Sequence, residues 1–133
     1  MASLEQALEN SNNWFADGEF CAKLSRLVNI VTDSKNSVSV EDLTSYYTDG
    51  LSDILVELGL QTEIIDNSIK NGPPFLIGTR IESSELNTIL LYGHGDTVPL
   101  QEGQWFEGII PNELKIIDEK IYGRGVADNK GQH

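Results

Sequence analysis

The chain of 133 residues has one cysteine, few basic residues and no apolar run of membrane-spanning length. Because Cys21 is alone, an internal disulfide is impossible, which excludes a disulfide-stapled secreted scaffold. Nine Lys and Arg residues against 21 Asp and Glu residues give a formal net charge of −12, which argues against nucleic acid and against an anionic membrane as partners. The N-terminal residues have no basic start and no apolar stretch of signal-peptide length, so we expect a cytoplasmic protein.

Apolar residues recur at helical intervals in the N-terminal half of the chain. They predict helical structure from Leu4 to Asn29 with an interruption at Asp17-Gly18, so two short helices and one broken helix are both compatible with the pattern. A polar loop is expected over residues 32–39. Ser39 then caps a helix that reaches about Leu58, with Asp42 as its capping-box partner.

Beyond residue 59 the pattern changes to that of strands. Three are predicted, over residues 60–65, 75–81 and 87–92, and the dense apolar run of the third indicates a strand that is buried on both faces. A small hairpin is expected over residues 114–122. The fold class is therefore α/β, with N-terminal helices followed by a mixed, partly parallel sheet.

The first candidate site directly follows the third predicted strand, in Gly93-His94-Gly95-Asp96. In an extended segment, residues two apart point to the same side, so an imidazole and a carboxylate project together from the strand end. Imidazole is the commonest transition-metal ligand, and a neighbouring carboxylate can orient its ring. The flanking glycines leave room beside the imidazole. A histidine that only closes the strand end by hydrogen bonds is the alternative interpretation.

The second candidate site is the glycine-rich turn from Tyr122 to Gly131. A phosphate cradle is excluded in detail, because Asp128 stands where a dinucleotide-binding turn needs its third glycine and no Gly-Lys-Ser/Thr triplet is present. The turn can instead place the Asp128 carboxylate as a metal ligand that faces the first site. An ordinary helix N-cap remains the alternative for this aspartate.

The amino-acid sequences of the two segments are more specific for one protein family than the types of ligand that they contain. Leu90 to Pro99, then Trp105, then Ile121 to Gly131 resembles a family of zinc metallopeptidases and amidohydrolases. This family includes acetylornithine deacetylase, succinyl-diaminopimelate desuccinylase, aminoacylase, carboxypeptidase-G type enzymes and cytosolic dipeptidases. The resemblance implies the N-terminal portion, residues 1–133, of a three-layer zinc-exopeptidase-like catalytic domain.

Carried over position by position, the resemblance makes His94 and Asp128 metal ligands, with Asp128 bridging two Zn²⁺ ions, which Co²⁺ or Mn²⁺ can replace. It makes Asp96 the catalytic-site carboxylate that orients His94, and it implies a cis peptide between Asp128 and Asn129. Metal-activated water would cleave an amide or peptide bond in a small peptide or N-acyl amino acid. The full-length protein could form a homodimer.

The chain also departs from the family pattern. No adjacent Glu pair follows Asp128, so the general base is missing, as are the later acidic ligand, the second histidine ligand and the lid or dimerisation domain. His133 matches no family ligand. A catalytic zinc has three protein ligands and this chain offers two, so we expect weak metal binding and no activity from the chain alone. The alternatives are a non-catalytic acidic α/β interaction domain and a truncated gene product.

Overall fold

A computed structural model describes residues 3–35 and 39–133. Met1 and Ala2 lie outside the described residues, as do residues 36–38 of the predicted polar loop. The elements, in chain order, are α1 (Leu4–Ala16), α2 (Glu19–Asn29), α3 (Val40–Ser45), the π-helix η1 (Tyr46–Leu51), α4 (Ser52–Glu57), β1 (Gln61–Ile65), β2 (Phe75–Thr79), β3 (Lys115–Ile117), β4 (Lys120–Tyr122) and the 3₁₀-helix η2 (Lys130–Gln132). None of the described helices is long and apolar enough to cross a membrane.

The N-terminal helical region forms two helices, because Gly18 adopts a left-handed conformation (φ +83°) between α1 and α2. The second predicted helix is also present, as the continuous run α3–η1–α4. Ser39 caps it as expected: the Ser39 hydroxyl accepts from Asp42 N at 3.1 Å, and the Asp42 carboxylate accepts from Ser39 N at 3.0 Å. The run ends before Gly59, which takes up φ +79°.

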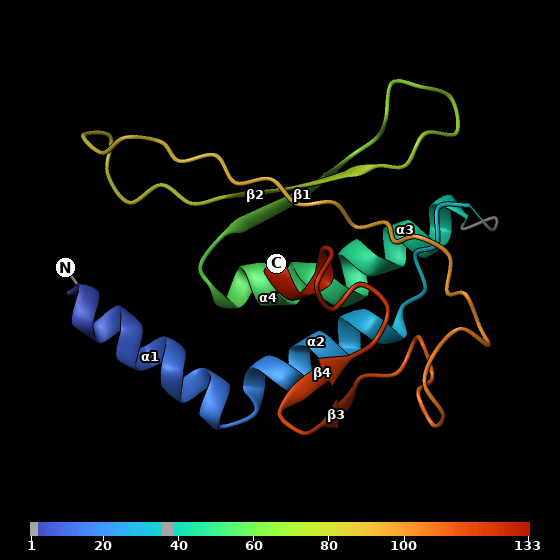
Figure 1. The fold of residues 1–133 in the computed structure, drawn as a ribbon. Helices are drawn as coiled ribbons and strands as arrows, with labels where there is room; N and C mark the ends of the chain where they lie inside the picture. The colour runs from blue at the N-terminus through green and yellow to red at the C-terminus, as the bar shows by residue number, and fades with distance from the viewer. Residues whose placement is uncertain (1–2, 36–38) are drawn as a thin grey trace.

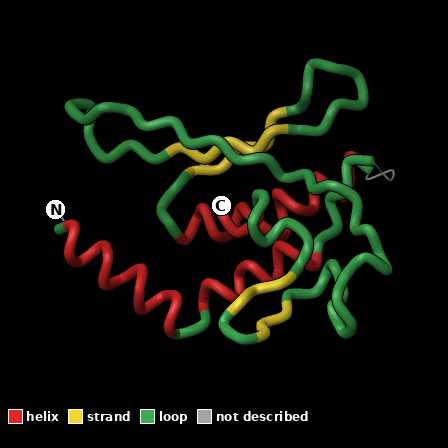
Figure 2. The backbone as a smooth tube through the Cα atoms, in the orientation of Figure 1, coloured by secondary structure: helices red, strands yellow, loops and turns green. Residues whose placement is uncertain are grey.

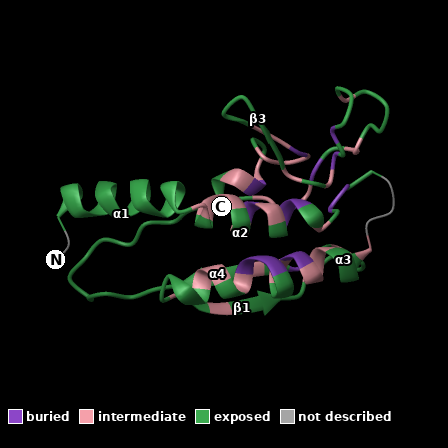
Figure 3. Ribbon diagram, turned by 90° about the horizontal axis from the view of Figure 1, so that it is seen from below, coloured by how far each residue is buried: buried purple, intermediate pink, exposed green. Residues whose placement is uncertain are grey.

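The core lies between α2 and η1. Leu27 of α2 packs with Tyr46 and Leu51 of η1, and Figure 3 shows buried residues on α2, whereas α1 is exposed along its length. A Cβ at Gly50 would lie 2.9 Å from Cδ2 of Leu27, so the glycine allows the close approach of the two helices. Arg26 Nη2 donates to Gly50 O at 2.6 Å and links the same helices.

Two separate hairpins flank this helical layer. In Figure 1 the β1–β2 hairpin covers α4 on one side, and β3–β4 lies near α2 on the other. Both ladders are antiparallel. The β3–β4 turn has positive φ at Asp118 (47°) and Glu119 (62°), the two-residue geometry that matches strand twist. The predicted hairpin over residues 114–122 is therefore confirmed, as are the strands predicted from residues 60 and 75.

The third predicted strand is wrong. Residues 87–92 form no strand, and Figure 2 shows the connection between β2 and β3 as loop throughout. Leu90 and Tyr92 are 91% and 88% exposed, so the apolar run is not buried on either face. A buried parallel strand needs a partner on each side, and β1 and β2 pair only with each other. Among the described residues, the parallel component of the predicted sheet is limited to one isolated bridge, between Asp33 and Thr97.

Candidate metal site

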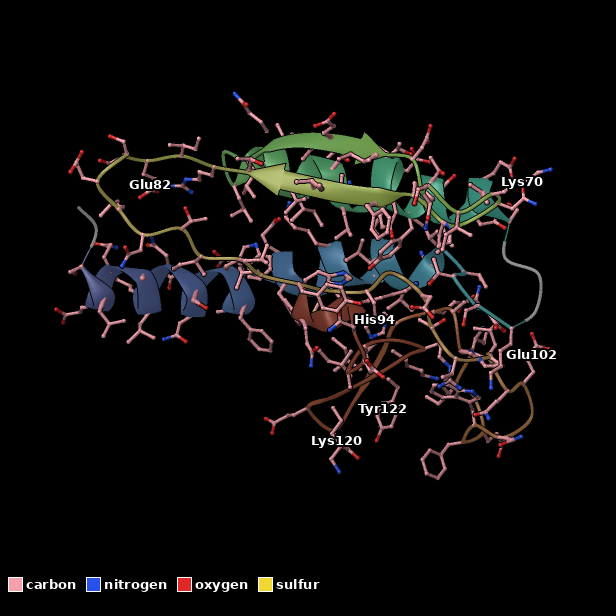
Figure 4. The ribbon with its side chains drawn as sticks, turned by 90° about the horizontal axis from the view of Figure 1, so that it is seen from above. Lys70, Glu82, His94, Glu102, Lys120 and Tyr122 are labelled. Carbon is pink, nitrogen blue, oxygen red and sulfur yellow. The ribbon has the colours of Figure 1, made fainter. Side chains whose placement is uncertain are left out.

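The imidazole of His94 lies between two carboxylates. Its Nε2 atom is 3.0 Å from Oδ1 of Asp128, and its Nδ1 atom is 3.1 Å from Oδ1 of Asp96 and 3.0 Å from the Asp96 carbonyl oxygen. Figure 4 shows His94 beside the C-terminal turn that carries η2. The structure thus brings together the three residues selected from the sequence, although His94 and Asp128 are 34 positions apart.

The charges around this imidazole favour a cation. Burial lowers the pKa of His94, but the hydrogen bonds to Asp128 and to the Asp96 backbone, with the charges of both carboxylates, outweigh it, so the pKa is raised. The Asp128 side chain is 81% exposed, so its second oxygen is accessible from solvent. Either a proton or a metal ion between Nε2 of His94 and the Asp128 carboxylate would interact favourably with both atoms.

The donor set fits a divalent metal. Imidazole nitrogen and carboxylate oxygen bind zinc at about 2.0–2.2 Å, so two such ligands of a tetrahedral ion lie about 3.3 Å apart. The 3.0 Å between Nε2 of His94 and Oδ1 of Asp128 is close to that separation. Within residues 3–35 and 39–133, no group of three or more His, Cys, Asp or Glu side chains is placed to hold a metal. His94 and Asp128 therefore offer at most two of the ligands that a zinc site needs.

The segment that carries His94 and Asp96 is fixed by the parallel bridge. Thr97 N donates to Thr32 O at 2.9 Å, and Ser34 N donates to Thr97 O at 3.1 Å, which ties this segment to the loop after α2. The glycine after His94 also contacts another element. A Cβ at Gly95 would lie 3.0 Å from the Tyr46 ring, so this glycine makes room for a tyrosine of η1.

The turn that carries Asp128 is equally constrained. The Asp128–Asn129 peptide is cis, as the family resemblance implies. Gly125 has φ +85°, and its Cβ would lie 3.0 Å from Cγ2 of Thr97, so the turn packs directly against the first segment. The N-cap alternative for Asp128 is wrong, because η2 begins at Lys130 and its N-cap is Asn129.

Lys130 attaches this turn to α2, a role that the sequence analysis missed. Its Nζ atom donates to Leu27 O at 2.8 Å and to Ile30 O at 2.6 Å, and it lies 4.9 Å from the centre of the Tyr46 ring. Lys130 is 3% exposed, and burial lowers its pKa to about 8. The available signal was a lysine two positions after a predicted metal-binding aspartate, because the lysine ammonium and a bound metal ion would repel each other.

Three further residues beside the site were also missed. Asn129 Oδ1 accepts from His94 N at 3.0 Å and lies 2.7 Å from Nε2 of His133. Nδ1 of His133 is 2.9 Å from the hydroxyl of Tyr46. His133 is one of two histidines in the chain, and this rarity was the available signal for it. Nothing in the sequence pattern indicates Tyr46.

The comparisons with known proteins point to one family of hydrolases. Residues 90–133, which contain all three predicted site residues, match the profile of Peptidase family M20/M25/M40. An acetylornithine deacetylase of Vibrio campbellii is 34% identical over 99 residues, covering 74% of this chain and 22% of the relative. A Beta-Ala-His dipeptidase of Mus musculus is 36% identical over 77 residues, covering 57% of this chain and 15% of the relative.

A solved structure extends the match to the fold. The crystal structure of human carnosine dipeptidase 1 superposes with a TM-score of 0.72 at 29% identity, over 85% of this chain and 25% of that one. The chain spans 22% of the length of the Vibrio campbellii relative, so these likenesses concern a part of each protein. The α/β fold class is confirmed by the superposition. On the family profile, the curated relatives and the shared fold together, the chain belongs to Peptidase family M20/M25/M40, a family of hydrolases.

Proposed function

We propose that these 133 residues are the N-terminal portion of the catalytic domain of a cytoplasmic, metal-dependent hydrolase that cleaves an amide or peptide bond. The observation that supports it most strongly is the 3.0 Å approach of His94 Nε2 to Asp128 Oδ1, with Asp96 on the other ring nitrogen. The similar proteins suggest two substrate classes, an N-acyl amino acid and a small peptide. Both contain the amide that this chemistry requires.

The proposed roles follow from the hydrogen bonds. His94 would hold the metal through Nε2, and Asp128 would hold it through its carboxylate, bridging to a second ion of a two-zinc site. With a metal on Nε2, Asp96 would accept a hydrogen bond from Nδ1–H of His94 and so hold the angle of the ring. A bound divalent ion supplies a water nucleophile at neutral pH and polarises the amide carbonyl.

The chain alone is proposed to be inactive. His94 and Asp128 form an incomplete ligand set, and the glutamate pair of the family pattern is absent from the sequence. Loss of a general base alone lowers a rate by about 10²–10⁴-fold. Hydrolysis of an N-acetyl amino acid or a dipeptide by the purified chain, abolished by His94→Ala, would contradict this part of the proposal.

Zinc titration of the purified chain by calorimetry tests the metal site. We expect weak binding that is abolished in His94→Ala and in Asp128→Asn. Asp66→Asn is the matched control, because Asp66 is an exposed carboxylate between β1 and β2. A folded chain that binds no zinc, or that binds it equally well without Asp128, would refute the metal site and favour the acidic interaction domain.

A further inference from the structure

The side chain of Asn129 joins two histidines. Its Oδ1 atom accepts from the backbone N of His94 at 3.0 Å and lies 2.7 Å from Nε2 of His133. Its Nδ2 atom donates to Oε1 of Gln132, which fixes the orientation of the amide group. The backbone position of His94 therefore depends on where the Asn129 amide is held.

The hydrogen bonds of His133 set its tautomer. An amide oxygen only accepts, so Nε2 of His133 must carry the hydrogen that points at Asn129. In a neutral ring Nδ1 is then the acceptor, and the hydroxyl of Tyr46 donates to it at 2.9 Å. The result is a series of hydrogen bonds in which the Tyr46 hydroxyl donates to His133 and His133 donates to Asn129.

The Tyr46 end of this series of hydrogen bonds is rigid. Tyr46 is 0% exposed and packs with Leu27 and Leu51 in the core. Its hydroxyl is therefore held by the packing of α2 against η1, and the Lys130 ammonium lies 4.9 Å from its ring centre. The core thus provides a fixed point from which hydrogen bonds extend to the candidate metal site.

Gly93 provides an independent observation. A Cβ at this position would lie 2.6 Å from Nε2 of His133 and 2.9 Å from Oδ1 of Asn129, so any other residue would displace these two side chains. Gly93, directly before the predicted metal ligand His94, therefore leaves room for the His133–Asn129 hydrogen bond.

We propose that Tyr46, His133 and Asn129 form a positioning relay that fixes the backbone of His94 at the metal site. The consequence for metal affinity rests on the proposed function. The relay itself does not rest on the proposed function, because it consists only of hydrogen bonds between residues of this chain. None of the three residues is assigned a contact with substrate or metal.

Three variants of the 133-residue chain test the relay, with Tyr122→Phe of β4 as the matched control for Tyr46→Phe. His133→Ala removes the ring, whereas His133→Gln keeps one donor and one acceptor in a neutral side chain. In the metal-free chain, nitrogen NMR should show hydrogen on Nε2 of His133, and His133→Ala and Tyr46→Phe should speed hydrogen exchange at the His94 amide. His133→Gln and Tyr122→Phe should leave that exchange near the wild-type rate.

The zinc titration adds the functional consequence. His133→Ala should weaken zinc binding about 10-fold, at the low end of the range for outer-shell partners, and His133→Gln should restore it. If the wild-type chain binds no zinc, the proposed function fails while the exchange measurements still decide the relay. Unchanged His94 exchange in His133→Ala, a His133→Gln variant as impaired as His133→Ala, or hydrogen on Nδ1 of His133 would each overturn it.

Discussion

Asp128 Oδ1 and Asp96 Oδ1 lie on opposite sides of one imidazole ring, 3.0 Å and 3.1 Å from the two nitrogens of His94. The arrangement separates two tasks. Under the proposed function, Asp96 would set the angle of the ring, and Nε2 of His94 would bind a cation together with the Asp128 carboxylate. Loss of the Asp96 carboxylate and loss of the Asp128 carboxylate should therefore have different effects on metal binding.

Asp96→Ala should weaken zinc binding without abolishing it. The variant keeps both predicted ligands but loses the carboxylate that orients His94, for which losses of about 10–100-fold are typical. The carbonyl oxygen of residue 96, which lies 3.0 Å from Nδ1, remains and should keep the loss near the lower limit. Calorimetric titration against the control Asp66→Ala measures it. An affinity equal to that of the control would show that Asp96 has no orienting role.

Lys130→Ala should destabilise the fold. The substitution leaves the carbonyl oxygens of Leu27 and Ile30 without their ammonium donor and removes a buried aliphatic chain. Together these effects should lower the free energy of unfolding by about 2–4 kcal/mol. Urea denaturation followed by circular dichroism measures the change, with the exposed Lys70→Ala as control. A difference of less than about 0.5 kcal/mol between the two variants would show that the attachment to α2 contributes little.

Local rules account for the elements that the sequence predicted correctly. Ser39 and Asp42 form a capping box because their spacing matches the first helical turn. Asp118 and Glu119 form a hairpin turn because they alone separate two short apolar segments, and a connection of two residues between antiparallel strands is a tight turn. The predicted proximity of His94 and Asp96 has a related reason: the two residues are two positions apart in one segment, and this relation needs no knowledge of the rest of the fold.

Long-range relationships account for the failures. Hydrophobicity indicated that residues 87–92 should be buried, but burial in a sheet depends on neighbouring strands, which a local pattern cannot supply. Lys130 was missed because its partners, the carbonyls of Leu27 and Ile30, are about 100 positions away and have no side-chain signature. The Tyr46–His133 hydrogen bond, across 87 positions, was invisible for the same reason.

Gly93→Ala should disturb the metal site without unfolding the protein. The added methyl would overlap His133 Nε2 at 2.6 Å, and an exposed side chain is displaced more easily than the core. We expect a thermal midpoint close to that of the wild type, together with faster hydrogen exchange at the His94 amide. Gly103→Ala is the control for adding a methyl, since its Cβ would meet nothing within 4 Å, although its positive φ (83°) adds strain of its own. A Gly93→Ala variant with wild-type exchange would show that the contact is not tight.

The exposed apolar segment that precedes His94 should make the chain self-associate. Ile89, Leu90 and Leu91 are 82–91% exposed and lie in a stretch without charge, proline or glycine, which favours pairing with a second extended chain. Leu90→Lys should therefore shift the chain towards monomer in sedimentation velocity at increasing concentration. Val56→Lys, at a 57% exposed apolar residue of α4, introduces the same charge elsewhere and should change association much less. A wild-type chain that stays monomeric at all concentrations, or equal effects of the two lysines, would mean that residues 89–91 do not drive association.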